Sequence, residues 1–350
     1  MLARGAMGLP RQAATAFTTI ILLTAVHVSR GAATLDALGL YLTKNGYGGA
    51  QLIRLGKFYY LPISSNGKLA NLIVDTGAPA SLIFRSRLNE LGLAESATNA
   101  PISSVFGTSP AFYGTATIKA LTAGNCILTN VPVAVIPPLT DIHRYGDPGG
   151  ALGLRELNKF GAVLDLPHRL IYFRPPQASF EMVPMGRLIQ TRMGWKPAAP
   201  GSAVSQRIRS ILTEEGWTPV PFAVVQRHLR VLAAVNGISC YLMVDTGASL
   251  TIIDADFAKR AQINVVPTRI SAEGIGKSAR DIALAPFVPL RVGSYQVKGF
   301  NATVGALDPA AIGRGTVSEI AGLLGIDYLI MNSAVFDFVA RTMYLRPAAR

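Results

Sequence analysis

Two short segments of the chain could each place a reactive carboxylate at the end of a strand. The segments LIVDTGAPASLI (residues 72–83) and LMVDTGASLTII (residues 242–253) both carry Asp-Thr-Gly-Ala after an apolar run. An apolar strand that runs into this tetrapeptide leaves a carboxylate at a strand end, where glycine allows close approach of another backbone. Two close carboxylates cannot both ionise cheaply, so they share a proton and together supply an acid and a base. Asp75 and Asp245 are therefore the candidate residues for acid and base chemistry.

The two motifs belong to a longer internal repeat. They are 170 positions apart, and at the same offset the Asn-Gly pair at 66–67 falls on the pair at 236–237. Further along the chain, residues 150–175 align without gaps with residues 322–347. A repeat of this length indicates two copies of one domain.

The elements that must position the motifs are predicted to be mostly strands. Short runs rich in β-branched residues are bounded by Gly, Pro, Asn or Ser, and the Asn-Gly pairs predict type I′ hairpins because both residues tolerate positive φ. Short helices are expected only at residues 86–93, 154–160, 257–262 and 326–332, with an amphipathic helix at 204–216 between the copies. The pattern favours an all-β protein.

Length and composition limit the domain organisation and the class of protein. The 350 residues are enough for two domains, and 50% hydrophobic with 15% charged residues exclude a disordered chain. The net charge of +13 would favour anionic partners, but the Lys and Arg residues are scattered, so nucleic-acid binding is not expected. The expected divisions are an N-terminal segment at 1–33, an N-terminal lobe at 48–176, a linker at 177–216 and a C-terminal lobe at 217–348.

The N-terminal segment has the features of a signal peptide. Arg4 and Arg11 form a positive region, residues 13–28 an apolar region, and residues 31–33 are small residues suited to cleavage. The alternative is an uncleaved membrane anchor, although the apolar run is shorter than the roughly 20 residues that a span needs. We expect export, to the periplasm or the medium, with membrane anchoring outside the cytoplasm as the alternative.

The motifs resemble those of the retropepsin-like and pepsin-like aspartic peptidases. The family pattern is an apolar pair, Asp-Thr/Ser-Gly, a small residue and, later, an apolar-apolar-Gly segment. Residues 73–78 with 151–153 supply it once, and residues 243–248 with 323–325 supply it again. The resemblance covers about residues 51–347 and implies two homologous retropepsin-like β-barrel lobes in one bilobal acid-protease fold, of bacterial type.

The resemblance also assigns roles to residues. Asp75 and Asp245 would form the catalytic dyad of an aspartic endopeptidase, with no cofactor. The segments that end in Gly153 and Gly325 would run behind the aspartate strands and brace them. Thr76 and Thr246 would cross-link the lobes through their hydroxyl groups. Gly77 and Gly247 would donate their amides to the carboxylates.

Flaps over the site are expected between each motif and the late glycine. The candidates are Phe106-Gly107 and Ile275-Gly276, where an apolar residue beside glycine can cover substrate and still flex. Neither segment carries the tyrosine of a pepsin-like flap.

Three departures from the family pattern bear on the chemistry. Ala78 and Ala248 stand where pepsin-like enzymes carry a hydroxyl residue that could stabilise the ionised aspartate, so the dyad should hold its proton to higher pH. In the ungapped alignment of residues 150–175 Arg155 occupies the position of the acidic Asp327. At the 170-residue offset of the motifs Pro79 occupies the position of Ser249.

Other kinds of site find little support. GIGKSA, residues 274–279, matches a dinucleotide fingerprint but lacks a surrounding βαβ unit. No Gly-x-Ser-x-Gly elbow is present, and the four histidines, His27, His143, His168 and His228, stand isolated, so no metal site is expected. Cys126 and Cys240 fall at non-equivalent positions of the repeat, so free thiols are expected.

The sequence as a whole predicts an exported, monomeric aspartic endopeptidase that cleaves extended peptides. One alternative is a peptide-binding or scaffolding protein with the same fold and no turnover. Another alternative is a site formed between two chains, but one chain already carries both motifs, so a second chain is not needed.

Overall fold

A computed structural model describes residues 36–104, 107–137, 146–174, 189–191, 194–196, 202–272, 280–316 and 319–348. The N-terminal segment at 1–33 and the flap candidates Phe106, Ile275 and Gly276 lie outside these ranges. No helix within the described ranges is long and apolar enough to cross a membrane.

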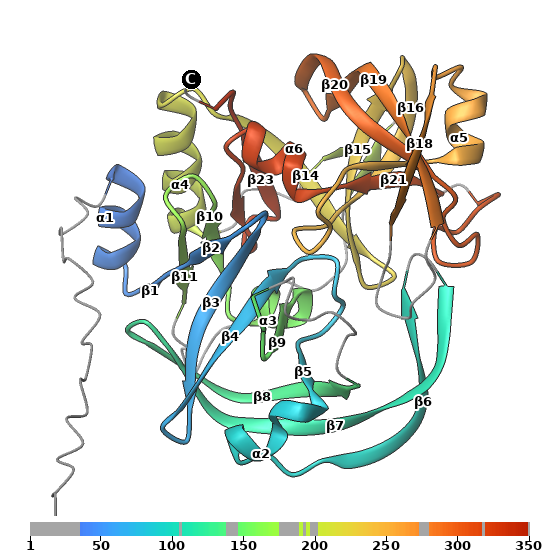
Figure 1. Cartoon of the computed structure of the whole chain (residues 1–350). Coiled ribbons are helices and arrows are strands. Elements are labelled where there is room, and N and C mark those ends of the chain that lie inside the picture. Colours follow the sequence, from blue (N-terminus) through green and yellow to red (C-terminus); the bar gives the residue numbers. More distant parts are fainter. Residues whose placement is uncertain are drawn as a thin grey trace, which may run out of the picture. The chain divides into compact units, whose positions relative to one another are not determined.

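The first lobe runs from residue 36 to residue 174 and consists mostly of strands (Figure 1). Its elements are α1 (Ala37–Lys44), β1 (Gly48–Gln51), β2 (Ile53–Leu55), β3 (Phe58–Ser65), β4 (Lys68–Asp75), β5 (Leu82–Phe84), the 3₁₀ helix η1 (Arg85–Arg87), α2 (Leu88–Leu91), β6 (Ser96–Ser104), β7 (Gly107–Ala123), β8 (Cys126–Ile136), β9 (Gly150–Gly153), α3 (Leu154–Lys159), β10 (Val163–Asp165) and β11 (Leu170–Phe173).

The second lobe, residues 202–348, repeats this order nearly element for element. Its elements are α4 (Ala203–Glu214), β14 (Thr218–Val225), β15 (His228–Val235), β16 (Ile238–Val244), β17 (Ile252–Asp254), α5 (Ala255–Arg260), β18 (Val266–Ala272), β19 (Arg280–Val292), β20 (Tyr295–Gly305), β21 (Ile320–Leu324), α6 (Ile326–Met331), β22 (Val335–Asp337) and β23 (Thr342–Leu345). Between the lobes, β12 (Ile189–Thr191) and β13 (Gly194–Lys196) pair as a hairpin. The all-β class with few short helices is confirmed.

The hairpins that enter the two motifs form as the sequence predicts. Asn66 and Gly67 have φ of 50° and 73°, and Asn236 and Gly237 have φ of 48° and 81°. Positive φ at both turn residues is the type I′ geometry, whose twist matches that of the flanking strands. The turns set the register of β3 with β4 and of β15 with β16, and therefore where each aspartate falls.

The two lobes are joined by a shared antiparallel sheet. β10 pairs with β22 in the register Val163↔Asp337, and the strand order across the junction is β1-β11-β10-β22-β23-β14. This order is symmetric, because β1, β11 and β10 are the counterparts of β14, β23 and β22.

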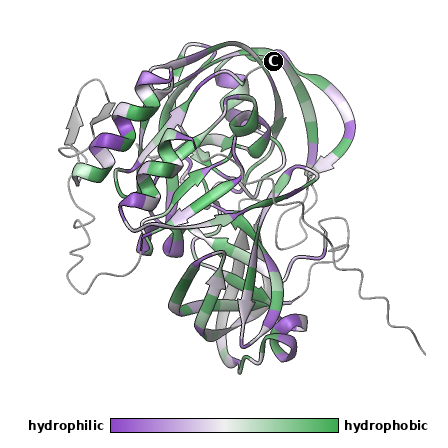
Figure 2. Ribbon diagram, turned by 90° about the vertical axis from the view of Figure 1, so that its left-hand side faces the viewer, coloured by the Kyte–Doolittle hydropathy of each residue, from purple (hydrophilic) through white to green (hydrophobic). Residues whose placement is uncertain are grey.

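Helices α1 and α4 cover one face of the shared sheet and contact each other. Figure 2 looks onto the side of Figure 1 that carries them and shows helices banded hydrophilic and hydrophobic, as amphipathic helices are. Their apolar sides pack onto strands of both lobes in one buried cluster. The members are Leu38, Leu42, Tyr47, Val163, Tyr172, Ile208, Ile211, Leu212, Trp217, Val335 and Tyr344.

The helix pair extends the internal repeat upstream. Leu38 and Leu42 of α1 precede Ile208 and Leu212 of α4 by the same 170 positions that separate the motifs. Helix α4, which falls in the range assigned to the linker, is thus the counterpart of α1. It was expected as an amphipathic helix from residues 204–216, and it buries its apolar side against the sheet.

Candidate active site

Each Asp-Thr-Gly motif follows a strand that is braced by a parallel neighbour. β4 pairs in parallel with β9, which places Asp75 opposite Gly153. In the second lobe β16 pairs in parallel with β21, and the Asp245 amide donates to the carbonyl oxygen of Leu324 at 3.0 Å. The late glycines therefore run beside the aspartate strands, as the resemblance implies.

Only glycine fits at the two late positions. A Cβ on Gly153 would lie 2.3 Å from the carbonyl carbon of Ala80, and one on Gly325 would lie 2.4 Å from that of Leu250. Such distances to backbone atoms leave no room for a side chain. The apolar-apolar-Gly segment is thus a packing requirement of the loop that follows each aspartate.

The two threonines lock the motifs to each other. The Thr76 hydroxyl donates to the Val244 carbonyl oxygen at 2.9 Å and accepts from the Thr246 amide at 3.0 Å. The Thr246 hydroxyl donates to the Val74 carbonyl oxygen at 2.6 Å and accepts from the Thr76 amide at 3.0 Å. Both threonines are buried, so these four hydrogen bonds between lobes are protected from water.

This lock brings the carboxylates of the two lobes together. A Cβ on Gly77 would lie 2.3 Å from Cγ of Asp245, and a Cβ on Gly247 would lie 2.5 Å from Cγ of Asp75. Each glycine thus leaves room for the aspartate of the other lobe. The two carboxyl groups therefore lie close together, and each shifts the pKa of the other.

Backbone amides hold one oxygen of each carboxylate. Oδ1 of Asp75 accepts from the amides of Gly77 at 2.8 Å and Ala78 at 2.9 Å. Oδ1 of Asp245 accepts from the corresponding amides of Gly247 at 2.8 Å and Ala248 at 3.0 Å. The two sites are therefore related by a local twofold symmetry in their backbone contacts.

Both carboxyl groups have a raised pKa. Burial raises the pKa of Asp75, and the amides of Ala78 and Gly77 oppose that rise. Burial raises the pKa of Asp245 well above its usual range, and the negative charge of Asp75 adds to the rise. Because the two carboxyl groups are close and buried, they titrate as a unit, and burial favours the protonated form of the pair.

A second pair of polar contacts supports the loop after each aspartate. In the first lobe the amide and hydroxyl of Ser81 donate to Oε2 of the fully buried Glu156 at 2.8 and 2.7 Å, and the Gly153 amide donates to the Ser81 hydroxyl at 2.9 Å. In the second lobe the amide and hydroxyl of Thr251 donate to the carboxylate of Asp327 at 3.0 and 2.8 Å.

These contacts correct the alignment of Arg155 with Asp327. The acidic group is not lost from the first lobe, because Glu156, one residue later and one methylene longer, reaches the equivalent place. Arg155 instead donates to Glu156 Oε1 at 2.5 Å. The sequence signal that could have shown this is the hydroxyl pair Ser81 and Thr251, which share the 170-residue offset of the motifs.

The flap candidates are only partly described. Gly107 is the first residue of β7 and pairs with Ser104 of β6, so it lies at the end of a hairpin between the motif and the late glycine. The β18–β19 hairpin is its counterpart in the second lobe. Phe106, Ile275 and Gly276 lie outside the described residues, so their role as flaps stays a prediction.

Both thiols are free, as expected. Cys126 is buried at the start of β8, whereas Cys240 lies in β16 and is partly exposed. Burial raises the pKa of both thiols, to about 12 for Cys240, so neither is a reactive thiolate.

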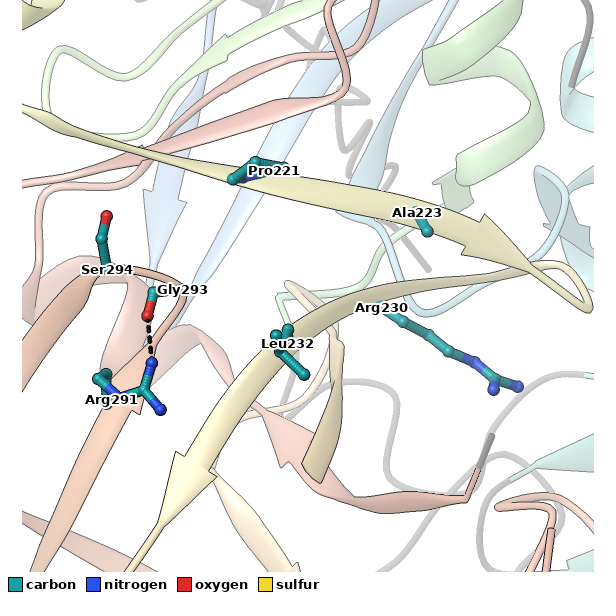
Figure 3. Close-up of a pocket in the computed structure, with 7 residues that line it drawn as sticks. All are labelled: Pro221, Ala223, Arg230, Leu232, Arg291, Gly293 and Ser294. Atoms are coloured by element: carbon teal, nitrogen blue, oxygen red, sulfur yellow. Dashed lines mark hydrogen bonds between the residues drawn. The ribbon is translucent and has the colours of Figure 1, made fainter. Parts of the chain in front are cut away.

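A separate cavity of about 280 Å³ lies in the second lobe and contains no residue of either motif (Figure 3). Pro221 and Ala223 of β14 and Leu232 of β15 line it, and Arg291 donates to the Gly293 carbonyl oxygen at 3.0 Å on its far side. The Arg230 side chain points away from Arg291 in Figure 3, so the two guanidinium groups do not form one anion site.

Comparisons with known proteins agree with this architecture. A family model described as aspartyl protease matches residues 61–155 and 231–328, together more than half of the chain. The crystal structure of the aspartic proteinase from Irpex lacteus is similar with a TM-score of 0.50 and 13% identity, over 87% of this chain and 98% of that one. The protease of EIAV, solved with the inhibitor HBY-793, shares 15% identity over 30% of this chain and 88% of that one, with a TM-score of 0.24. No curated protein matches the sequence.

Proposed function

This chain belongs to the aspartyl protease family, and on that premise we propose that it is an aspartic endopeptidase whose catalytic dyad is Asp75 and Asp245. One observation carries the proposal. Each aspartate comes from a different lobe, and the threonine lock brings the two carboxyl groups close together, each against the glycine of the opposite motif. That arrangement supplies an acid and a base at one point without a cofactor.

The chemistry of the proposed site follows from the shared proton. The ionised carboxylate takes a proton from a water molecule as the water oxygen attacks the peptide carbonyl carbon, and the protonated carboxyl group gives its proton to the carbonyl oxygen. Collapse of the resulting diol breaks the C–N bond, as the ionised carboxylate takes a proton from one diol hydroxyl and the protonated carboxyl group gives its proton to the leaving nitrogen. The raised pKa of the pair keeps that one proton available, which the two steps require.

The proposed substrates are extended peptides that bind in a cleft between the lobes as an added strand. Gly107 and the hairpin that it ends would cover them from the first lobe, and the β18–β19 hairpin would do so from the second. The proposed location is periplasmic or secreted, or anchored to a membrane with both lobes outside the cytoplasm. Recovery of chains that begin near residue 34 from a non-cytoplasmic fraction would establish cleavage and export.

The test of function is cleavage of a peptide library by the purified protein, with and without a statine-containing peptide. The statine hydroxyl mimics the tetrahedral intermediate and should bind the dyad far more tightly than substrate does. We expect cleavage that statine blocks, and its loss in Asp75→Asn. Peptide binding without any cleavage would instead support a binding or scaffolding protein.

A further inference from the structure

A second cluster of polar side chains lies on the helix-covered face of the shared sheet, in the first lobe only. Asp36 caps the N-terminus of α1, Asp165 is the last residue of β10, and His168 lies in the turn between β10 and β11. One ligand atom from each of the three lies within 4.8 Å of the others. His168, which stood isolated in the sequence, is therefore not isolated in the fold.

The two carboxylates are oriented by the backbone so that their second oxygens meet at the imidazole. Oδ1 of Asp36 accepts from the Gly39 amide at 2.7 Å, and Oδ1 of Asp165 accepts from the His168 amide at 3.1 Å. The two free oxygens both face Nδ1 of His168, at 3.2 Å from Asp36 Oδ2 and 2.8 Å from Asp165 Oδ2. Such outer hydrogen bonds fix the direction of carboxylate ligands.

A buried tyrosine lies on the strand that pairs with the strand of Asp165. Tyr172 is 2% exposed, and its hydroxyl has no hydrogen-bond partner among the residues that the structure describes. Tyr172 pairs with Val163, two residues before Asp165, so Tyr172 and Asp165 face the same side of the sheet.

The charge of the cluster is not balanced by the imidazole alone. Two carboxylate oxygens, one from Asp165 and one from Asp36, face the single Nδ1 atom of His168. One imidazolium can neutralise only one of them. A divalent cation bound by a neutral imidazole would neutralise both Asp36 and Asp165, and would give the Tyr172 hydroxyl a partner.

We propose that Asp36, Asp165 and His168 bind one divalent transition-metal ion of the Zn²⁺ type, with the Tyr172 hydroxyl or water completing the coordination. Imidazole nitrogen and carboxylate oxygen are a Zn²⁺ ligand set, and tetrahedral bonds of about 2.1 Å place ligand atoms about 3.4 Å apart. The His168–Asp36 separation of 3.2 Å is close to this, and the His168–Asp165 separation must open by about half an ångström. The His168 side chain is 43% exposed, which allows that movement and an entry path.

The role of this ion would be to tie α1 to the shared sheet, independently of peptide hydrolysis. Asp36 belongs to the helix cap, and Asp165 to the strand that pairs with the second lobe. The metal would thus link the first helix of the described chain to the junction between the lobes, and it would stabilise the folded chain because the unfolded chain has no such site.

The second lobe has the carboxylate at the strand end, but it lacks both the nitrogen ligand and the second carboxylate. Gln206 stands at the 170-residue offset from Asp36, and Ser202 caps α4. Asp337 corresponds to Asp165, and its Oδ1 accepts from the amides of Val339 and Ala340 at 2.9 Å each. Ala340 stands where the first lobe has His168, and Tyr344 stands where it has Tyr172. The second lobe is therefore a built-in control that should not bind the ion.

The test is titration of the full chain, freed of metal by a chelator, with Zn²⁺ in a calorimeter, and with Co²⁺ followed by visible absorption. We expect one ion per chain, d–d bands of Co²⁺ bound by nitrogen and oxygen, and a higher Tm with Zn²⁺ than with chelator. An unchanged Tm with no saturable heat would mean that the triad is only a proton-bridged ion cluster, and would overturn the proposal.

The variants locate the site. Asp36→Asn keeps a good helix cap and removes one ligand charge, and His168→Ala removes the nitrogen; each should weaken Zn²⁺ binding at least about 10-fold. Tyr172→Phe should weaken it less, while the matched Tyr344→Phe in the second lobe should leave it unchanged. Binding of Zn²⁺ that survives both Asp36→Asn and His168→Ala would place the ion elsewhere and refute the assignment.

Discussion

The two lobes hold their aspartates with the same backbone contacts but with different side chains behind them. Around Asp75 and Asp245 the amide and threonine hydrogen bonds correspond one to one. Behind them the first lobe uses a buried Glu156 and the second a partly exposed Asp327. The contacts that create the shared site are thus kept symmetric, while those that only support one lobe have diverged.

The comparison also separates two kinds of polar group at the shared sheet. Asp165 and Asp337 both end a junction strand and accept backbone amides, but only Asp165 has an imidazole beside it. Burial raises the pKa of the Asp337 carboxyl group, and Ala340 stands where the first lobe has His168. The two lobes therefore share the carboxylate at the strand end, while only the first lobe adds a histidine beside it.

The largest expected effect tests whether the lobes contribute equal halves of one site. Asp75→Asn and Asp245→Asn should each lower kcat/KM about 1000-fold or more, because either change removes the shared-proton pair. The measurement is peptide cleavage, with circular dichroism to show that each variant folds. Near wild-type turnover in one of the two variants would break the equivalence of the lobes.

The next effect concerns the threonine lock, where symmetry predicts similar losses. Thr76→Val and Thr246→Val should each destabilise the protein by about 2–4 kcal/mol, since each leaves a buried carbonyl and a buried amide without a partner. Urea unfolding measures the change in free energy. Thr76→Ser and Thr246→Ser keep the hydroxyl and are the matched controls, expected to cost much less.

Behind the site, asymmetry predicts unequal losses. Glu156→Gln should cost about 2–3 kcal/mol, because a fully buried charged acceptor of the Ser81 hydroxyl is lost, and Asp327→Asn about 1 kcal/mol, because its carboxylate is partly exposed. Arg155→Ala is the control, since its side chain is 45% exposed and its ion pair is worth about 1 kcal/mol or less. A larger loss of stability in Arg155→Ala than in Glu156→Gln would mean that Arg155, and not Glu156, is the counterpart of Asp327.

A smaller effect links the dyad to stability. The folded-state pKa of Asp245 lies above its unfolded value. The contribution of this group to the free energy of folding is therefore complete below about pH 4, and it is lost as pH rises through the folded pKa. Asp245→Asn should therefore stabilise the fold by about 0.5–2 kcal/mol at pH 7, while abolishing activity, and by less at pH 4. Unfolding curves at the two pH values that show no such difference would contradict the raised pKa.

The smallest expected effect tests the two alanines beside the dyad. Wild type should have its optimum at about pH 4 to 6, because the singly protonated pair is the active form. Ala78→Ser with Ala248→Ser should move the optimum downward by less than about one pH unit, because each new hydroxyl stabilises the ionised form. A pH profile at low substrate concentration measures this. No downward movement would show that these positions do not set the proton affinity.

Much of the fold follows from local signals in the sequence. The Asn-Gly turns, the β-branched runs and the doubled motif predict hairpins, strands and two lobes, because turn geometry and strand register depend on neighbouring residues. Gly77 and Gly247 could be placed at the carboxylates from the motif, although their packing against the aspartate of the opposite lobe is visible only in three dimensions.

The rest was decided by contacts between residues far apart in the sequence. The alignment of Arg155 with Asp327 missed Glu156, because an ungapped alignment compares positions along the chain, whereas a side chain one methylene longer can reach the same point from the next residue. Asp36 and His168 are 132 positions apart and meet only because α1 packs on the sheet that joins the lobes. The amino-acid sequence by itself determined that this chain carries two aspartates in two repeated lobes. The tertiary structure decided which groups stand behind them, because reach and burial depend on distances through space rather than along the chain.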